Sequence, residues 1–211
     1  MRTPALEVRE AATGSPRALV ILLHGGVVDG YGRAHRGRAA YLRMLPFRRA
    51  MPDDVTVWRL RYRYHGWNGA AADPVRDLAW ALDQARTRHP RLPVILVGHS
   101  MGARAALWGA GDPQVTAVCA LAPWIEPGDP VEQLAGRTVL IAHGVADRIT
   151  DPAASRRYAA AAEQAGAFVT FLDVTGDGHG MVRRARYWHR LVGDFVAART
   201  PRPDTAPATS P

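Results

Sequence analysis

The chain has only four serines, and one of them stands in a sequence that can make it a nucleophile. Ser100 is the centre of Gly98-His99-Ser100-Met101-Gly102, which follows the apolar run 93–97 and precedes the helical stretch 103–110. A turn this tight between a strand and a helix forces the serine into strained backbone geometry, and the flanking glycines let the two elements approach closely. We therefore expect the Ser100 hydroxyl to stand at the carboxyl end of a strand, where it can attack an acyl group.

A serine hydroxyl needs a base to take its proton, and the base needs a carboxylate to orient it. Asp147 lies just beyond the apolar run 138–142, and His179 lies between glycines after the apolar run 168–174. Both therefore follow strand ends, as Ser100 does, and strand ends of a parallel sheet gather at one edge. The sequence predicts Ser100 as nucleophile, His179 as base and Asp147 as acid.

Other side chains compete for the last two roles. Asp151 is better explained as a helix N-cap, while Asp173 and Asp177, which flank the end of the histidine's own strand, stay open as acids. The competing bases are histidines in helices or arginine-rich segments, namely His35, His65, His89 and His189.

An oxyanion needs two backbone N–H donors that point at the same place. One is expected from Met101, the residue after the nucleophile. The other is expected from Gly26 in the loop after the run 18–23, with Val27 as second choice, because glycines there permit the backbone to turn its N–H groups inward. His24, His99 and His143 invite comparison with metal ligands, but packing and orienting roles explain them better. The sequence therefore predicts no metal and no cofactor.

Short apolar runs alternate with helical patterns between about residues 18 and 197. Most runs are apolar on both faces, as are parallel strands covered by helices on both sides. The alternation predicts an α/β fold with a doubly wound, mostly parallel sheet flanked by helices. The expected strands are 18–23, 55–60, 94–97, 115–121, 138–142 and 168–174, with 6–9 as an extra edge strand. The expected helices begin with N-caps at Asp73 and Asp151 or span 33–50, 101–111 and 181–198.

Over residues 17–198 the sequence resembles the α/β-hydrolase superfamily. The sequences His24-Gly25-Gly26, 98–102, His143-Gly144-x-x-Asp147 and Gly178-His179 fall where that superfamily places its oxyanion loop, nucleophile elbow, acid and base. The chain is most similar to the small cap-less esterase, lipase and dienelactone-hydrolase-like group. Dienelactone hydrolases use a cysteine nucleophile, so their particular substrate does not transfer to a chain with Ser100. The resemblance implies a serine hydrolase that cleaves a small carboxylic ester, thioester or lactone through an acyl-enzyme.

Larger members of the superfamily insert a helical lid where this chain has only residues 121–136, so we expect an open site without a lid. Four side chains in the surrounding loops are candidates for apolar substrate-binding walls, although a packing role stays open for each of them: Tyr31, Trp67, Trp124 and Met181.

The charge of the chain is concentrated in one segment. Arginine supplies all 27 basic residues against 19 acidic ones, which gives a net charge of +8. Nine arginines and only two aspartates lie between Arg33 and Arg63, so this segment alone carries +7. This concentration of charge has three interpretations. It is a solvated face, a filter for anionic substrates, or the binding surface of a non-catalytic protein that binds an anionic partner through residues 33–63. We expect no nucleic-acid binding, because the charge is local.

Length and composition indicate one domain over residues 1–199, followed by a disordered Pro-, Thr- and Ala-rich tail, 200–211. The single cysteine, Cys119, rules out a disulfide within the chain. No apolar run approaches the length of a membrane span. We expect a cytoplasmic protein that acts on a small molecule, with monomer and homodimer both open.

Overall fold

The computed structural model describes residues 2–202, and its centre is a seven-stranded sheet in the order β1-β3-β2-β4-β5-β6-β7. β1 pairs antiparallel with β3, and every other pairing is parallel. The expected mostly parallel sheet and its extra edge strand are both confirmed. The strands are β1 (Ala5–Arg9), β2 (Ala18–Leu23), β3 (Val55–Arg61), β4 (Val94–His99), β5 (Val115–Leu121), β6 (Thr138–Gly144) and β7 (Phe168–Val174).

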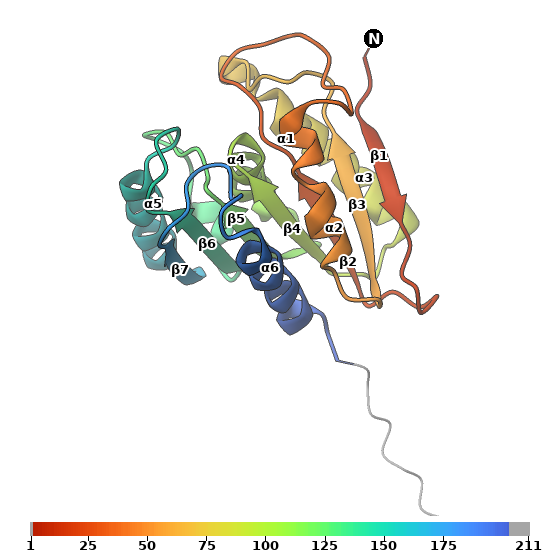
Figure 1. Ribbon diagram of the computed structural model, residues 1–211. Coiled ribbons are helices and arrows are strands. Elements are labelled where there is room, and N and C mark those ends of the chain that lie inside the picture. The colour runs from red at the N-terminus through yellow and green to blue at the C-terminus, as the bar shows by residue number, and fades with distance from the viewer. Residues whose placement is uncertain (1, 203–211) are drawn as a thin grey trace, which may run out of the picture.

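Helices cover both faces of the sheet, with α1, α2 and α6 on one face and α3, α4 and α5 on the other (Figure 1). The central strands β2 and β4 are buried at every position, whereas the edge strand β7 has exposed residues between less exposed ones. This difference is the one expected between two-sided and edge positions in a sheet. The helices are α1 (Ala39–Leu42), α2 (Leu45–Arg49), α3 (Asp73–Arg88), α4 (Met101–Trp108), α5 (Pro152–Gln164) and α6 (Ala185–Arg199), with 3-10 turns η1 (Gly69–Ala71), η2 (Gly109–Gly111) and η3 (Glu132–Leu134).

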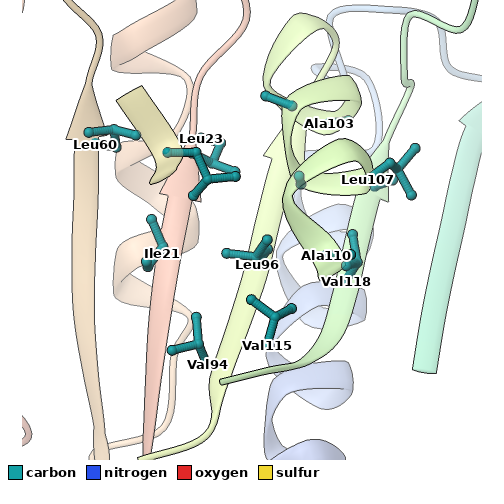
Figure 2. Packing of buried hydrophobic residues seen from close by; sticks show 14 of the residues in the cluster. Ile21, Leu23, Leu60, Val94, Leu96, Ala103, Leu107, Ala110, Val115 and Val118 are labelled. Carbon is teal, nitrogen blue, oxygen red and sulfur yellow. The ribbon is translucent and has the colours of Figure 1, made fainter. Parts of the chain in front are cut away.

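The helix that follows Ser100 packs closely on the sheet because its inner side chains are small. Ala103 and Leu107 of α4 belong to the same buried cluster as Leu96 of β4 and Val118 of β5 (Figure 2). Alanines let the helix axis approach the strands, and close packing leaves little freedom to shift. The amino end of α4 is therefore held firmly against β4.

The core on the opposite face contains the one cysteine. Cys119 of β5 is completely buried in the cluster that also contains Trp188 and Val192 of α6. Burial raises the pKa of its thiol, so the sulfur stays protonated and unreactive in the folded protein.

Three expectations about helices were wrong. Residues 33–50 form two short helices instead of one, because Pro46 has no N–H to donate to the carbonyl four residues before it. Asp73 is not an N-cap: Ala72 takes that position, and the Asp73 carboxylate instead accepts hydrogen bonds from Asn68 and Arg63. The last helix begins at Ala185, four residues later than expected.

Two further features bear on access to the site. Between β5 and β6 the chain forms only the 3-10 turn η3, so within residues 2–202 no lid domain is inserted at this point, as expected. Among the residues described, no helix is both long enough and apolar enough to cross a membrane. The expected disordered tail falls largely on residues 203–211, which lie outside the described part of the chain.

Candidate active site

Ser100 occupies a strained turn between β4 and α4. Its backbone has φ 57° and ψ −120°, a conformation that L-residues rarely adopt. A β-carbon at Gly98 would lie 2.3 Å from the Gly102 carbonyl oxygen, and one at Gly102 would lie 2.4 Å from the Leu23 carbonyl oxygen. Only glycine fits at either position, so the two glycines allow the close strand–helix contact that holds Ser100 in this conformation. Ser100 is 8% exposed.

The structure brings Ser100, His179 and Asp147 together in hydrogen-bonding order. His179 Nε2 lies 3.0 Å from Ser100 Oγ, and His179 Nδ1 lies 2.9 Å from Asp147 Oδ2. The three side chains come from the loops that follow β4, β7 and β6, which all open at one edge of the sheet. These distances are within reach for proton transfer from a serine to a histidine.

Asp147 is the most heavily hydrogen-bonded group of the site. Its Oδ1 accepts the N–H groups of Ile149 at 2.8 Å and Thr150 at 3.1 Å. Its Oδ2 accepts the Thr150 hydroxyl at 2.9 Å and faces His143 Nε2 at 3.0 Å as well as His179. Burial alone would raise the pKa of Asp147, but the two backbone donors and His179 outweigh it and lower the pKa to about 2. Asp147 is therefore ionised throughout the neutral range.

A second serine–histidine pair meets the same carboxylate from the other side. His143 Nδ1 lies 2.9 Å from Ser155 Oγ, while His143 Nε2 contacts Asp147. Burial lowers the pKa of His143 despite the neighbouring carboxylate, so the ring is neutral and donates one hydrogen bond to Asp147. Ser155 is a fully buried residue of α5, so no substrate can reach it. Ser100 is the serine of the two that faces the open edge.

Thr150 and His143 are partners of Asp147, and Ser155 is a partner of His143, that sequence reasoning missed or explained differently. The spacing His143-x-x-x-Asp147 was the one available signal, because residues four apart can approach each other when the chain turns after a strand. Nothing local marks Thr150 or Ser155, since their contacts depend on how the loop folds back.

The three carboxylates that competed with Asp147 for the role of acid make other contacts. Asp177 accepts hydrogen bonds from the backbone of Gly178 at 2.9 Å and Arg184 at 3.0 Å, and from Trp188 Nε1 at 2.9 Å. It therefore fastens the loop that carries His179 to α6. Asp151 caps α5 by accepting from Ala153 N at 2.8 Å, as expected, and Asp173 pairs with Arg156 at the surface. Within residues 2–202, none of the three is hydrogen-bonded to His179.

The loop after β2 lies directly beside the nucleophile. A β-carbon at Gly25 would be 3.3 Å from Ser100 Cβ, and one at Gly26 would be 2.4 Å from Met101 Cε. The Val27 N–H, the second-choice oxyanion donor, already donates to the His65 carbonyl oxygen at 3.0 Å and is not available. In the described part of the chain the Gly26 N–H has no hydrogen-bond acceptor, and Met101 begins α4, so its N–H has no partner within the helix.

Residues 64–68 hold this loop in place. Trp67 N donates to Val27 O at 3.0 Å, Gly66 N donates to Gly30 O at 3.0 Å, and Asn68 Oδ1 accepts from Gly30 N at 2.8 Å. These contacts fasten the whole segment that follows Gly26. The loop is therefore preorganised rather than free to rearrange.

Two histidines of the site pack and orient, as the sequence suggested. His99 Nε2 donates to the His179 carbonyl oxygen at 2.9 Å, and the two rings lie 4.8 Å apart. Burial lowers the pKa of His99 to about 3, and burial likewise lowers that of His24 to about 4, so both rings are neutral. His24 packs against Tyr62 at 4.4 Å. Within residues 2–202, no three His, Cys, Asp or Glu side chains are arranged to hold a metal ion.

Two of the four expected substrate-wall residues, Trp67 and Met181, have largely buried side chains that make packing contacts. Trp67 is only 4% exposed and lies against the Arg104 guanidinium at 4.3 Å, with Trp124 on the same cation at 4.4 Å. Met181 is buried in the core beneath α6. Tyr31 is exposed and lies edge-on to Tyr64 at 5.5 Å. Trp124 is partly exposed, and its backbone N–H donates to the Ser100 carbonyl oxygen at 3.3 Å.

Three features define the α/β-hydrolase class. They are a mostly parallel sheet with helices on both faces, a strained serine between β4 and α4, and an aspartate and a histidine in loops at the same edge of the sheet. The chain belongs to the family described as serine aminopeptidase S33, whose model matches residues 14–139, more than half of its length. The matched segment contains Ser100 and the loop at Gly26 but ends before Asp147 and His179. No curated protein sequence matches the chain.

Solved structures share the fold at low sequence identity. Est1E from Butyrivibrio proteoclasticus superposes with a TM-score of 0.73 at 14% identity, over 93% of this chain and 94% of that one. Esterase PE8 gives 0.71 at 19% identity, over 93% and 99%. XC6422 from Xanthomonas campestris, described as an α/β serine hydrolase without a lid, gives 0.69 at 20% identity, over 95% and 90%. At these identities the likeness establishes the fold.

Proposed function

We propose that the protein hydrolyses a small carboxylic ester, or a related thioester or lactone, through an acyl-enzyme on Ser100. The observation that carries the proposal is the continuous path from Ser100 Oγ to His179 Nε2 at 3.0 Å and from His179 Nδ1 to Asp147 Oδ2 at 2.9 Å. The family is described as a serine aminopeptidase family, and one of the structures with the same fold is named as an esterase.

The chemistry follows from the hydrogen-bond directions. Asp147 is ionised and accepts from His179 Nδ1, so the neutral ring presents an unprotonated Nε2 to the Ser100 hydroxyl. Nε2 takes the hydroxyl proton as Oγ attacks the carbonyl carbon, and Asp147 stabilises the imidazolium that forms. His179 then protonates the leaving alcohol, and afterwards it activates a water molecule that releases the acid from Ser100.

Two N–H groups support stabilisation of the oxyanion. We assign this role to Gly26 and Met101, because the first has no other acceptor in the described chain and the second opens α4, whose amino end attracts negative charge. The close fit of Gly26 against the Met101 side chain supports their convergence beside Ser100.

The rim of the site favours an apolar acyl or alcohol group. Several exposed apolar side chains lie in the loops that follow β2, β6 and β7, at the same sheet edge as the triad, and Ile149 is 75% exposed. Exposed apolar clusters commonly mark binding surfaces. The rim residues are Val27, Val28, Val145, Ile149 and Val182.

A fluorophosphonate probe and a p-nitrophenyl ester panel test the proposal. Labelling and ester turnover should both disappear in Ser100→Ala and persist in Ser15→Ala, which changes an exposed serine far along the chain from the site. The labelled peptide should contain Ser100 and not Ser155. Turnover that survives in Ser100→Ala would contradict the assignment.

The same panel should include an amino-acid p-nitroanilide, because the family description names aminopeptidases. Faster cleavage of this amide than of the esters would keep the serine mechanism and overturn the ester assignment. No labelling and no turnover of any substrate would favour a non-catalytic binding protein.

A further inference from the structure

A cavity lined by four arginines opens beside the loop that carries Gly26. Its volume is about 390 Å³, and it lies at the carboxyl end of β3, where the first residue of β1 pairs with Arg61. Figure 1 shows the start of β1 and the loop between β2 and α1 at this same end of the sheet. The lining residues are Arg2, Thr3, Arg33, Arg61, Tyr62 and Arg63.

Most of the positive charge in this cavity is not compensated. Arg63 pairs with Asp73 and Asp77, but Arg2, Arg33 and Arg61 form no ion pair with a carboxylate anywhere in residues 2–202. The Arg61 Nε atom is buried and has no hydrogen-bond acceptor in that range. Like charges gathered in a partly enclosed space repel each other, and a buried donor without an acceptor is costly. Both costs fall when an anion occupies the cavity.

Contacts to the surrounding loops hold the guanidinium groups. Arg2 Nη1 donates to the Tyr31 carbonyl oxygen at 2.6 Å, and Arg61 Nη1 donates to Ala34 O at 3.4 Å. Arg2 and Arg63 both lie against the Tyr64 ring, at 5.6 and 5.5 Å from its centre. Groups fixed in this way lose little freedom when a ligand binds, and a planar guanidinium matches two oxygens of a phosphate or carboxylate.

The other arginines of the basic segment 33–63 are largely engaged elsewhere. Arg36 and Arg59 pair with Glu7, and Arg43 and Arg48 donate to backbone carbonyl oxygens. The segment is therefore not a continuous cationic stripe of the kind that follows a nucleic-acid backbone. Arg38 and Arg49 lie outside the lining of the cavity, so the unpaired guanidinium groups that share one enclosed space are those of the cavity, which suits a single anionic group.

The cavity adjoins the catalytic edge through one loop. Arg33 pairs with Tyr64 across an isolated bridge, and Val27 pairs with Gly66 across another, so the segment that begins at Gly26 forms one wall of the cavity. We propose that this arginine cavity binds a phosphate, sulfate or carboxylate group of the substrate, which makes anionic esters the preferred substrate class. The substrate part of the inference rests on the proposed function; the anion site does not.

Direct binding tests the anion site without turnover. We expect calorimetry to detect pyrophosphate binding to the wild-type protein and to Ser100→Ala, and this binding should weaken as salt concentration rises. Arg2 and Arg33 are exposed, so the double variant Arg2→Gln/Arg33→Gln should fold, whereas Arg63 is left in place because Asp77 depends on it. The double variant should bind pyrophosphate about tenfold more weakly or worse. Arg91→Gln, an exposed arginine before β4 at the opposite edge, is the matched control and should bind normally.

Substrate preference is measured with two esters that share a leaving group, p-nitrophenyl butyrate and the mono-p-nitrophenyl ester of glutaric acid. The ratio of kcat/KM for the acidic ester over the neutral one should fall about tenfold in the double variant and stay unchanged in Arg91→Gln. Pyrophosphate binding that is absent, or that is equal in the double variant, would overturn the proposal. Arginine-dependent binding without any change in the ester ratio would overturn the substrate assignment.

Two outcomes distinguish the anion site from the proposed ester hydrolysis and from nucleic-acid binding. If neither ester is hydrolysed but pyrophosphate binds through the arginines, the proposed function fails while the anion site stands. If a short single-stranded DNA displaces pyrophosphate at much lower concentration than the acidic ester does, the arginines serve a polyanion and the proposal is overturned.

Discussion

Replacing Asp147 by asparagine probes the hub of the site, because five donors meet on this one carboxylate. Two backbone N–H groups reach Oδ1, while Thr150, His143 and His179 reach Oδ2. Asparagine keeps the shape but turns one of the two acceptors into an NH₂ donor. The substitution therefore forces a choice about which set of donors loses its acceptor.

The structure indicates which choice costs less. If the amide NH₂ faced the backbone N–H groups of Ile149 and Thr150, both would be left without an acceptor, at roughly 1–3 kcal/mol each. If it faces the histidines instead, each ring can move its proton to the other nitrogen, and His143 Nδ1 can then donate to Ser155 Oγ. We expect this second arrangement, with stability lowered by only about 1–2 kcal/mol.

That arrangement disables His179. A ring that accepts from the amide at Nδ1 carries its proton on Nε2, which faces Ser100 and can no longer take the hydroxyl proton. Loss of the correct tautomer by this route lowers turnover by roughly 10⁴-fold.

Initial rates on p-nitrophenyl acetate and urea unfolding followed by tryptophan fluorescence measure the two effects separately. Asp177→Asn is the informative comparison, because Asp177 is one of the two competing acids that the sequence leaves open, and this variant should keep activity within about tenfold. The reasoning is refuted if Asp147→Asn keeps more than a tenth of its activity, or if Asp177→Asn loses as much as Asp147→Asn.

Three further outcomes are expected. The pKa of Asp147 falls from 3.8 to about 2 on folding, so its ionised form contributes about 2 kcal/mol to the free energy of unfolding above pH 4. This contribution is lost as pH falls toward 2, and urea midpoints at pH 5 and pH 2.5 should record the loss. Gly98→Ala places a β-carbon 2.3 Å from the Gly102 carbonyl oxygen, so it should cost about 3 kcal/mol or more in urea unfolding, whereas Gly37→Ala, in an exposed loop, should cost less than about 1 kcal/mol. Asp177→Ala leaves three donors without their acceptor and should lower stability by about 3 kcal/mol, whereas Asp173→Ala, at the surface, should lower it by less than about 1 kcal/mol. Equal losses of stability in a denaturant titration would contradict the role of Asp177 in anchoring the His179 loop.

Much of the sheet could be predicted because its strands are marked locally. A run such as 18–23, apolar at every position, can only be a strand or helix buried on all sides, and its length and flanking glycines favour the strand. The order of Ser100, Asp147 and His179 followed from the same signals, since each comes soon after such a run. Burial of a strand and the position of its end are properties of a short stretch of sequence.

Two features that the sequence did not indicate have a different cause, namely contacts made by the fold. Asp73 before a proline has the local form of an N-cap, yet Arg63 and Asn68 recruit its carboxylate from elsewhere in the fold. Trp67 is an aromatic residue in a loop at the sheet edge, yet its side chain packs against Arg104 in the interior. In both cases a side chain from another element or loop competes with the local preference, and one sequence does not reveal which partners meet.

The buried thiol of Cys119 can report how often the folded protein opens around β5. It lies on β5 in the middle of the sheet, next to β4, the strand that leads into Ser100, and burial keeps the thiol protonated. A thiol reagent can react only during moments when β5 is exposed, so its labelling rate counts those moments. A ligand that holds the loops at the sheet edge should lengthen the interval between them, so the cysteine reports occupancy of a site it never touches.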